Sequence, residues 1–271
     1  MFGAGVSVED ELRKALPGHF VITGPLGAGG QGSVFKGTCN GHEAAIKAFT
    51  PTTDPRRVDR EMELLRAIDC DNLVRVIDAT KLTILAVEVS VIAYEFHSNG
   101  DLMGHLQPTA PSLTAAELGR IGREIGGAIE ALWGQRIVHR DVKPANIVRA
   151  GDGRFVLVDV GLARHIDRSA ISVVGSAPGT PGFMSPEQAM GRKALTIHAD
   201  AFSLGVTLYT LAAKRHPFNG NQGVIMQRLV PTSLHSLRPD LPEALCRAID
   251  KLMSLRPSGR PTNLVDLFAN Y

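Results

Sequence analysis

Short hydrophobic runs and glycines dominate the first third of the chain. Between Phe20 and Phe49, apolar residues alternate with glycines and polar residues, which predicts short antiparallel strands joined by tight turns. Asp54 and Pro55 suit the N-cap and first turn of a helix, and apolar residues then recur at helical spacing as far as Ile68. Two more strand-like segments follow, at Leu73–Ile77 and Val89–Tyr94. We therefore expect a small sheet with one main helix.

The remainder of the chain has mostly helical spacing. Thr114 and Glu117 form a capping-box pattern, and the helix that follows them carries one apolar stripe as far as Gly134. Further helices are predicted over Ala199–Ala213, Pro242–Leu255 and Asn263–Ala269. Two short strands are expected among these helices, at Ile137–Val138 and Phe155–Val158.

Turn residues divide the chain into three parts. Ser7 and Asp10 resemble a capping box, so residues 1–18 are predicted to be a lead-in segment with a short helix that Pro17-Gly18 ends. Ser98-Asn99-Gly100 marks a second break. The chain is therefore expected to be an α+β protein, with a small sheet lobe at 19–97 and a larger, mostly helical lobe at 98–271.

Composition narrows the choice of partners and location. The 29 Lys and Arg residues nearly balance the 27 Asp and Glu residues, so no strong field favours nucleic acid or anionic lipid. The three cysteines lack C-x-x-C spacing, which indicates neither a zinc site nor a disulfide scaffold and favours the reducing cytoplasm. The apolar stretch Leu82–Phe96 is too short to span a membrane as a helix and contains Glu88 and Glu95.

A glycine-rich stretch in the first lobe could bind phosphates. Residues Gly27–Val34 read GAGGQGSV, a G-x-G-x-x-G-x-V pattern between two strand-like runs. Glycines let a hairpin backbone approach phosphates closely, whereas a dinucleotide fold would need a helix to begin at this turn. A glycine-rich hairpin with no ligand is the alternative. The next strand ends in Ala44-Ala45-Ile46-Lys47, which matches the V-A-I-K pattern whose lysine binds the α and β phosphates.

The most specific pattern lies in the helical half. Residues 139–146 read HRDVKPAN, which matches H-R-D-x-K-P-x-N in full. A carboxylate at Asp141 can orient an incoming hydroxyl and accept its proton, and Asn146 can hold a magnesium ion. Lys143 would neutralise charge on a transferred phosphoryl group. A solvated charged loop is the alternative, and a match over the whole string makes it a poor one.

These patterns occur in the order found in one enzyme family. After the HRDVKPAN string come DVG at 159–161, SPE at 185–187 and HADAFSLG at 198–205. From about Phe20 to Phe268 the chain resembles serine/threonine protein kinases, most closely the bacterial members. The resemblance implies a two-lobed protein kinase fold that binds ATP with Mg²⁺, or with Mn²⁺ as an alternative. It also implies transfer of the γ-phosphoryl group to serine or threonine hydroxyls of protein substrates.

The resemblance implies further catalytic and metal-binding roles. Lys47 would pair with Glu61 on the helix, with Glu63 as a less favoured alternative. Asp159 would hold the metal together with Asn146.

The chain departs from the family pattern at two positions, and the resemblance implies roles for two further carboxylates. Val160 stands where the family has a phenylalanine, so an aromatic ring that helps to set active and inactive packing is absent. Glu187 would pair with the late Arg260, and Ser185 replaces an alanine before it. Asp200 resembles a helix aspartate that braces the catalytic loop. Each carboxylate alone would be an ordinary buried or capping group.

The resemblance also outlines a nucleotide site. Tyr94 would be the gatekeeper, and the backbones of Glu95 and His97 would hydrogen-bond adenine in an apolar slot. The residues implied to contact the nucleotide are Leu26, Gly27, Ala28, Gly29, Gly30, Gln31, Gly32, Ser33, Val34, Ala45, Lys47, Glu95, His97 and Val148.

Two other functions are alternatives to protein phosphorylation. A small-molecule kinase of the aminoglycoside-phosphotransferase kind shares the fold, but Lys143 and the SPE segment argue against it. A pseudokinase would signal without catalysis, yet Lys47, Asp141, Asn146 and Asp159 are all in place. The sequence therefore favours an active protein kinase.

Autophosphorylation is expected between Asp159 and Glu187. That segment contains Ser169, Ser172 and Ser176, of which Ser172 is favoured, and Arg140 would bind the phosphate. Thr180 is predicted instead to be a structural hydroxyl bonded to the catalytic loop.

Overall fold

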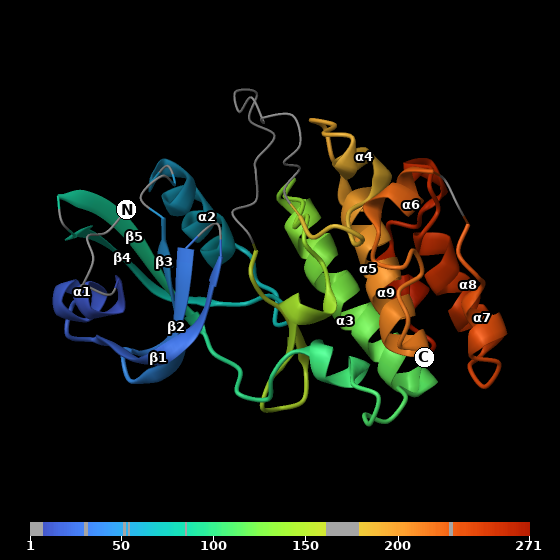
Figure 1. Ribbon diagram of the computed structural model, residues 1–271, viewed down its shortest axis with the longest axis horizontal. Helices are drawn as coiled ribbons and strands as arrows, with labels where there is room; N and C mark the ends of the chain where they lie inside the picture. The colour runs from blue at the N-terminus through green and yellow to red at the C-terminus, as the bar shows by residue number, and fades with distance from the viewer. Residues whose placement is uncertain are drawn as a thin grey trace. The chain divides into compact units, whose positions relative to one another are not determined.

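Five antiparallel strands form the first unit of the fold, drawn in blue to teal in Figure 1. The structure, a computed structural model, describes residues 8–29, 32–50, 53, 55–84, 86–160, 179–227 and 230–271. The strands are β1 (Phe20–Gly29), β2 (Gly32–Cys39), β3 (His42–Phe49), β4 (Val76–Ile84) and β5 (Val87–Glu95). Their order in the sheet is β1-β2-β3-β5-β4, and the unit also contains helices α1 (Val8–Ala15) and α2 (Pro55–Ala67).

The core of this unit lies against one face of the sheet. Alternate residues of β2 are buried, as expected of a strand that has one face covered, whereas β3 is buried at every residue from Ile46 to Phe49. Phe35, Ala44 and Ile46 belong to this buried cluster. Leu12 of α1 is only 1% exposed and belongs to the same cluster, so the lead-in helix is part of the core.

The second unit is mainly helical and is drawn in green to red in Figure 1. Its helices are α3 (Ala115–Gly134), α4 (Pro186–Ala189), α5 (Ile197–Ala213), α6 (Gln222–Met226), α7 (Leu234–Leu237), α8 (Glu243–Leu252) and α9 (Leu264–Leu267). Helix α5 is buried along nearly its whole length and packs against both α3 and α8. The capping box predicted for α3 is present, because Thr114 and Glu117 satisfy each other's amide groups.

Two short strands and three 3-10 turns complete the described part of this unit. The strands β6 (Ile147–Arg149) and β7 (Phe155–Leu157) form an antiparallel pair directly after the HRDVKPAN string. The 3-10 turns are η1 (Leu102–Leu106), η2 (Pro144–Asn146) and η3 (Pro257–Gly259). Among the described residues, no helix is both long enough and apolar enough to cross a membrane.

The border between the two units is not a single point in the sequence. The first unit comprises the described residues up to Ile68 together with Val74–Phe96, and the second comprises Asp69–Leu73 and the described residues from His97 onward. Hydrogen bonds attach the 69–73 segment to the rest of the second unit. The amide of Leu157 donates to the Asn72 carbonyl at 2.8 Å, and the Asn72 side chain donates to the Phe155 carbonyl at 2.9 Å.

Two expected strands differ from the structure. The strand predicted at Leu73–Ile77 begins only at Val76 and then continues to Ile84 as β4. Ala86, directly before β5, has a φ of 63°. An alanine in this left-handed region leaves no glycine or asparagine signal in the sequence. No strand forms at Ile137–Val138, where Val138 instead packs with Leu195 and Ala199.

Two glycines of α3 provide a matched test of how closely the C-terminal segment, α9 and Phe268, packs against α3. A Cβ at Gly122 would lie 2.7 Å from the buried ring of Phe268, whereas a Cβ at Gly127 would meet only Val265 Cγ2, at 3.6 Å. We expect Gly122→Ala to lower the free energy of unfolding by about 1–3 kcal/mol through overpacking. Gly127→Ala should raise it by up to about 1 kcal/mol, because alanine favours a helix over glycine. Urea unfolding of both variants measures the difference, and equal effects would contradict the close approach of α9 to α3.

Candidate active site

Three polar residues surround the Asp141 carboxylate of the HRDVKPAN loop. Lys143 Nζ lies 2.7 Å from Asp141 Oδ2, and the side-chain amide of Asn146 donates to the same oxygen at 3.0 Å. Thr180 donates to Asp141 Oδ1 through its backbone amide at 2.9 Å and through its hydroxyl at 2.7 Å. Lys143 Nζ also donates to the Thr180 hydroxyl, at 2.5 Å. The predicted structural role of Thr180 is therefore confirmed.

These donors set the charge of the central carboxyl. Burial alone would raise the pKa of Asp141, but the hydrogen bonds from Lys143 and Thr180 outweigh it and hold the pKa below its ordinary value. Asp141 is therefore ionised at neutral pH, as an acceptor for an incoming hydroxyl must be.

A buried aspartate of α5 holds the loop in place. Asp200 is 1% exposed and accepts the backbone amides of His139 and Arg140 at 2.7 and 2.8 Å. Burial raises the pKa of Asp200, and the two amide hydrogen bonds oppose that rise without cancelling it. Arg140 has a φ of 71°, a conformation that a non-glycine residue keeps only when its surroundings enforce it. The bracing role predicted for Asp200 is thus confirmed.

Gln188 is a support of the same loop that sequence reasoning missed. Its side-chain amide donates to the Arg140 carbonyl at 2.7 Å, and the residue is 2% exposed. The available signal was its position directly after Glu187 in the SPE segment. Ser185 replaces an alanine in the family pattern. Its hydroxyl oxygen accepts a hydrogen bond from the backbone amide of Gln188 at 3.3 Å and so caps α4.

The two metal-ligand candidates, Asn146 and Asp159, belong to the second unit and are connected by a backbone hydrogen bond next to Asp159. Asn146 is 6% exposed, and its amide nitrogen donates to the Asp141 carbonyl at 2.8 Å, which leaves the side-chain oxygen as its metal-ligand atom. The amide of Val158 donates to the Asn146 carbonyl at 2.9 Å, so the chain leading to Asp159 is tied to Asn146. Asp159 is exposed and has a φ of 52°, while Val160 is buried. Gly161 lies outside the described residues.

The predicted pair of Glu187 and Arg260 forms as a buried ion pair. The guanidinium donates to both carboxylate oxygens, at 2.6 and 3.0 Å, and its side chain is fully buried. It also donates to the His198 carbonyl at 2.7 Å and lies over the Phe202 ring, 4.9 Å from its centroid. This arrangement joins the SPE segment to the N-terminal end of α5.

The glycine-rich hairpin lies in the first unit. Gly27 and Val34 face each other across β1 and β2, so the pattern connects two strands as expected, and Gly30 and Gln31 lie outside the described residues. Gly32 has a φ of 147°, and a Cβ there would lie 2.0 Å from the Ala48 carbonyl oxygen. Only glycine can occupy this position without moving β3.

Lys47 is a buried cation on β3. It pairs with Val34 on β2 and with Ile92 on β5 and is 7% exposed. Its predicted partner Glu61 belongs to α2, although its side chain lies outside the described residues. The alternative, Glu63, has an exposed side chain, which suits a solvated charge better than a partner for a buried lysine.

The residues implied for adenine belong to strands of both units. Tyr94 and Glu95 end β5, and Ala45 pairs with Tyr94 on β3. The amide of Glu95 donates to the Arg75 carbonyl at 2.9 Å, so any adenine contact from Glu95 would come from its carbonyl. Val148 lies on β6 of the second unit.

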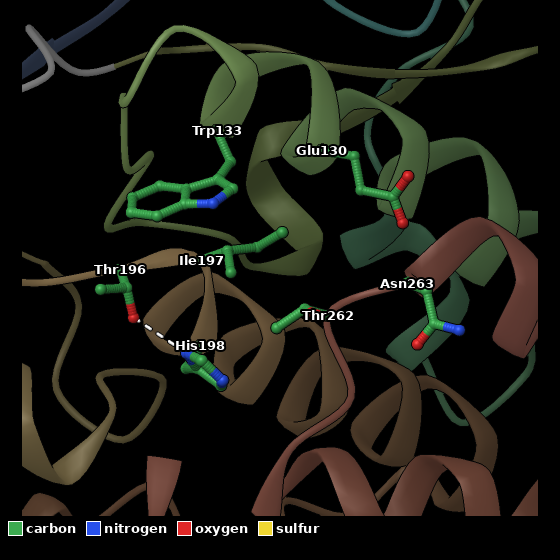
Figure 2. A pocket seen from close by; sticks show the side chains of 7 residues that line it. All are labelled: Glu130, Trp133, Thr196, Ile197, His198, Thr262 and Asn263. Atoms are coloured by element: carbon green, nitrogen blue, oxygen red, sulfur yellow. Dashed lines mark hydrogen bonds between the residues drawn. The ribbon is translucent and has the colours of Figure 1, made fainter. Parts of the chain in front are cut away.

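A cavity in the second unit, shown in Figure 2, does not coincide with this chemistry. Its volume is about 450 Å³, and none of its lining residues belongs to the predicted site. The lining residues are Glu130, Trp133, Thr196, Ile197, His198, Thr262 and Asn263.

Comparison with known proteins agrees on the fold. The family model described as "Protein kinase domain" matches residues 20–269. The serine/threonine-protein kinase AfsK of Streptomyces coelicolor is 32% identical over 275 residues, which cover 96% of this chain and 33% of AfsK. Serine/threonine-protein kinase pkn2 of Myxococcus xanthus is 31% identical over 76% of this chain and 25% of its own length. The chain thus spans about a third or less of these relatives.

Solved structures show the same fold. The PknI kinase domain of Mycobacterium tuberculosis matches with a TM-score of 0.72 at 23% identity, covering 93% of this chain and 94% of that one.

Removing one partner of the buried ion pair should be costly. Arg260→Ala leaves Glu187, whose side chain is 12% exposed, without its counter-ion, and we expect the free energy of unfolding to fall by about 3–5 kcal/mol. Arg247→Ala is the matched control, since Arg247 forms an exposed pair with Glu243 that is worth about 0.5 kcal/mol or less. Chemical unfolding tests both, and a similar small loss from each would contradict a structural role for the buried pair.

Proposed function

Because the chain belongs to the protein kinase domain family, we propose that it is an active kinase that transfers the γ-phosphoryl group of ATP to serine or threonine hydroxyls of proteins. The observation that carries the proposal is the ionised Asp141 carboxylate, which Lys143, Asn146 and Thr180 hold in one orientation. The serine/threonine-protein kinases named above contain a similar domain.

Asp141 would act on the substrate hydroxyl. In the proposed reaction the hydroxyl oxygen forms a bond to the γ-phosphorus, the bond from that phosphorus to the ADP oxygen breaks, and the hydroxyl proton passes to Asp141. The lowered pKa makes this carboxylate a weak base, so its main contribution is to orient the hydroxyl before the proton moves. Lys143, 2.7 Å from Asp141, would neutralise charge on the transferred group.

The metal-ligand candidates fit a magnesium ion. Mg²⁺ prefers oxygen ligands, and the exposed Asp159 carboxylate and the Asn146 side-chain oxygen supply them, with Mn²⁺ as an alternative ion. The ion would neutralise charge on the phosphates. Lys47, paired with Glu61, would hold the α and β phosphates, and the glycine-rich hairpin would offer its backbone amides.

The nucleotide base would be held mainly by apolar contacts. Val34, Ala45 and Val148 would supply apolar contacts to adenine, while the Glu95 carbonyl and the His97 amide would bond its polar edge.

Replacement of the central carboxylate tests the proposal. Asp141→Asn keeps the shape of the side chain but removes its charge, so we expect the rate of phosphate transfer from labelled Mg-ATP to protein to fall by about 100-fold or more. Binding of ATP should remain, because Asp141 is not among the nucleotide contacts. Asp152→Asn, at an exposed turn of the same unit, is the matched control and should retain full activity.

The outcomes separate the competing functions. Transfer by the Asp141 variant at the parental rate would contradict the role of this carboxylate. Binding of ATP without any transfer by the parent would instead indicate a pseudokinase, and transfer to small hydroxyl compounds alone would indicate a small-molecule kinase.

We also propose autophosphorylation within the segment that contains Ser169, Ser172 and Ser176, all of which lie outside the described residues. Arg140 would bind the phosphate. A phosphoserine carries about two negative charges, and its oxygens can accept two parallel N–H bonds from one guanidinium. Its backbone is anchored by Asp200, as a receptor requires.

Mass spectrometry of active protein checks this proposal. We expect phosphate on Ser172 in the parent and none in Asp141→Asn, and a larger loss of activity from Ser172→Ala than from Ser169→Ala. An active parent with all three serines unmodified would show that another mechanism switches the enzyme.

A further inference from the structure

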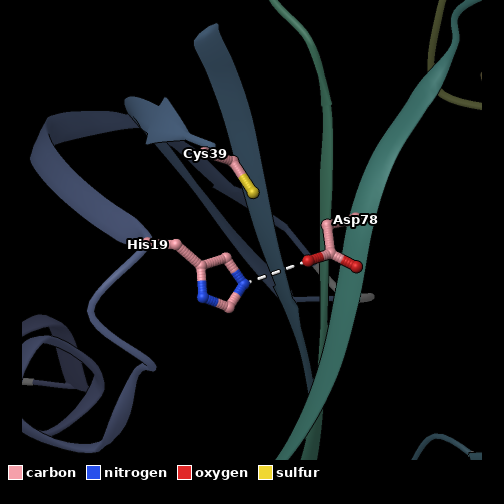
Figure 3. A group of neighbouring side chains, drawn as sticks. All are labelled: His19, Cys39 and Asp78. Atoms are coloured by element: carbon pink, nitrogen blue, oxygen red, sulfur yellow. Dashed lines mark hydrogen bonds and ion pairs between the residues drawn. The ribbon is translucent and has the colours of Figure 1, made fainter. Parts of the chain in front are cut away.

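Three potential metal ligands converge in the first unit, away from every residue assigned above. His19, Cys39 and Asp78 come from the α1–β1 turn, the end of β2 and the start of β4, and Figure 3 shows their side chains pointing toward one another. Their ligand atoms all lie within 4.8 Å of one another. A histidine, a thiol and a carboxylate from three separate segments are thus placed together by the fold alone.

The backbone fixes the position of each member. The amide of Asn40 donates to the His19 carbonyl at 3.0 Å, which ties the turn after Cys39 to the turn that carries His19. Asn40 and Gly41 both have positive φ values, of 52° and 80°, in the two-residue turn that ends β2. The register shift between Val76 and Asp78 is a bulge in β4, and such bulges re-aim side chains.

The two oxygens of Asp78 are already divided between two tasks. Oδ1 accepts the amide of Ala79 at 2.8 Å and lies 3.7 Å from the Arg66 guanidinium, which orients the carboxylate. Oδ2 lies 3.0 Å from His19 Nε2. His19 Nε2 and Asp78 Oδ2 are thus held against each other by a hydrogen bond, and an ion bound by both atoms would take the place of the shared proton.

The geometry is close to that of a zinc centre. Zinc–ligand bonds of 2.0–2.3 Å in a tetrahedron place ligand atoms about 3.3–3.6 Å apart. The His19–Asp78 distance of 3.0 Å is near this value, and the sulfur would need to approach by at most about 1.5 Å from the 4.8 Å limit. Cys39 is fully buried, whereas the side chains of His19 and Asp78 are 42% and 32% exposed, so an ion can reach the group from solvent.

The charges favour a divalent cation of intermediate softness. A zinc ion would displace the thiol proton of Cys39 to solvent as the zinc–sulfur bond forms, and thiolate and carboxylate would then balance its two positive charges. Imidazole and thiolate ligands select Zn²⁺ over Mg²⁺ or Ca²⁺.

We propose that His19, Cys39 and Asp78 form a zinc site with one coordination position open to solvent, separate from the site that carries the phosphoryl-transfer residues. The ion would join the α1–β1 turn, the β2–β3 hairpin and β4. Since these segments come from three parts of the chain, bound zinc would stabilise the first unit against unfolding.

Cobalt substitution tests the site directly. Tag-free, reduced chain is stripped of metal and titrated with Co²⁺ and then with Zn²⁺. We expect one Co²⁺ per chain with a sulfur-to-cobalt charge-transfer absorption band that Zn²⁺ abolishes. Zinc should also raise the Tm of the parent.

The three cysteines supply matched controls. Cys39→Ala should lose the charge-transfer band and weaken zinc binding by more than about 100-fold, while Cys70→Ala and Cys246→Ala should keep both. If Cys39→Ala fails to fold by circular dichroism, His19→Gln decides, because its side chain is largely exposed and its loss must weaken zinc binding similarly.

Three results would overturn the proposal. They are a parent that binds no zinc at micromolar concentration, a cobalt adduct without the sulfur band, and a band that survives Cys39→Ala. Zinc bound instead at the phosphoryl-transfer site would be lost in Asp159→Asn and kept in Cys39→Ala, which also contradicts the assignment.

Discussion

The buried carboxylate of Asp200 is the contact on which the catalytic loop depends. A carboxylate inside a protein is costly unless donors surround it, and backbone amides turned inward are costly unless they find acceptors. Asp200 and the amides of His139 and Arg140 satisfy these two requirements together. Because Arg140 adopts a left-handed conformation, the loop would not keep its shape without an acceptor at this position.

Helix α5 serves as the frame for more than this loop. Besides Asp200, it offers the His198 carbonyl and the Phe202 ring to Arg260, which in turn holds Glu187. Ser203 donates to the Phe183 carbonyl at 2.8 Å. The catalytic loop and the SPE segment are therefore positioned by one buried helix, so the rigidity of that helix is transmitted to both.

The folded unit also orients the carboxylate of Asp141. Burial of Asp141 works against its charge, and the hydrogen bonds from Lys143 and Thr180 outweigh burial and lower its pKa. Two donors to this carboxylate, Lys143 and Asn146, lie within five residues along the loop, whereas Thr180 comes from 39 residues away. The orientation of the carboxylate is thus a property of the folded unit, and the loop sequence alone does not produce it.

Most of what the sequence by itself determined came from patterns of neighbouring residues. The α+β class, the glycine-rich hairpin and the α3 cap depend on neighbouring residues, whose backbone preferences and hydrogen bonds are set locally. The pairings of Asp200 and of Glu187 with Arg260 were reached through the family resemblance, because no local signal connects residues so far apart.

Tertiary structure decided what depends on strand register and long-range approach. Ala86, which lies between β4 and β5, is left-handed without a glycine or asparagine signature in the sequence, and the support from Gln188 depends on where α4 packs. Cysteine spacing indicated no zinc site, since spacing patterns such as C-x-x-C detect only ligands that lie a few residues apart in the sequence. His19, Cys39 and Asp78 are separated by 20 and 39 residues, and only the pairing of strands and the bulge in β4 bring them together.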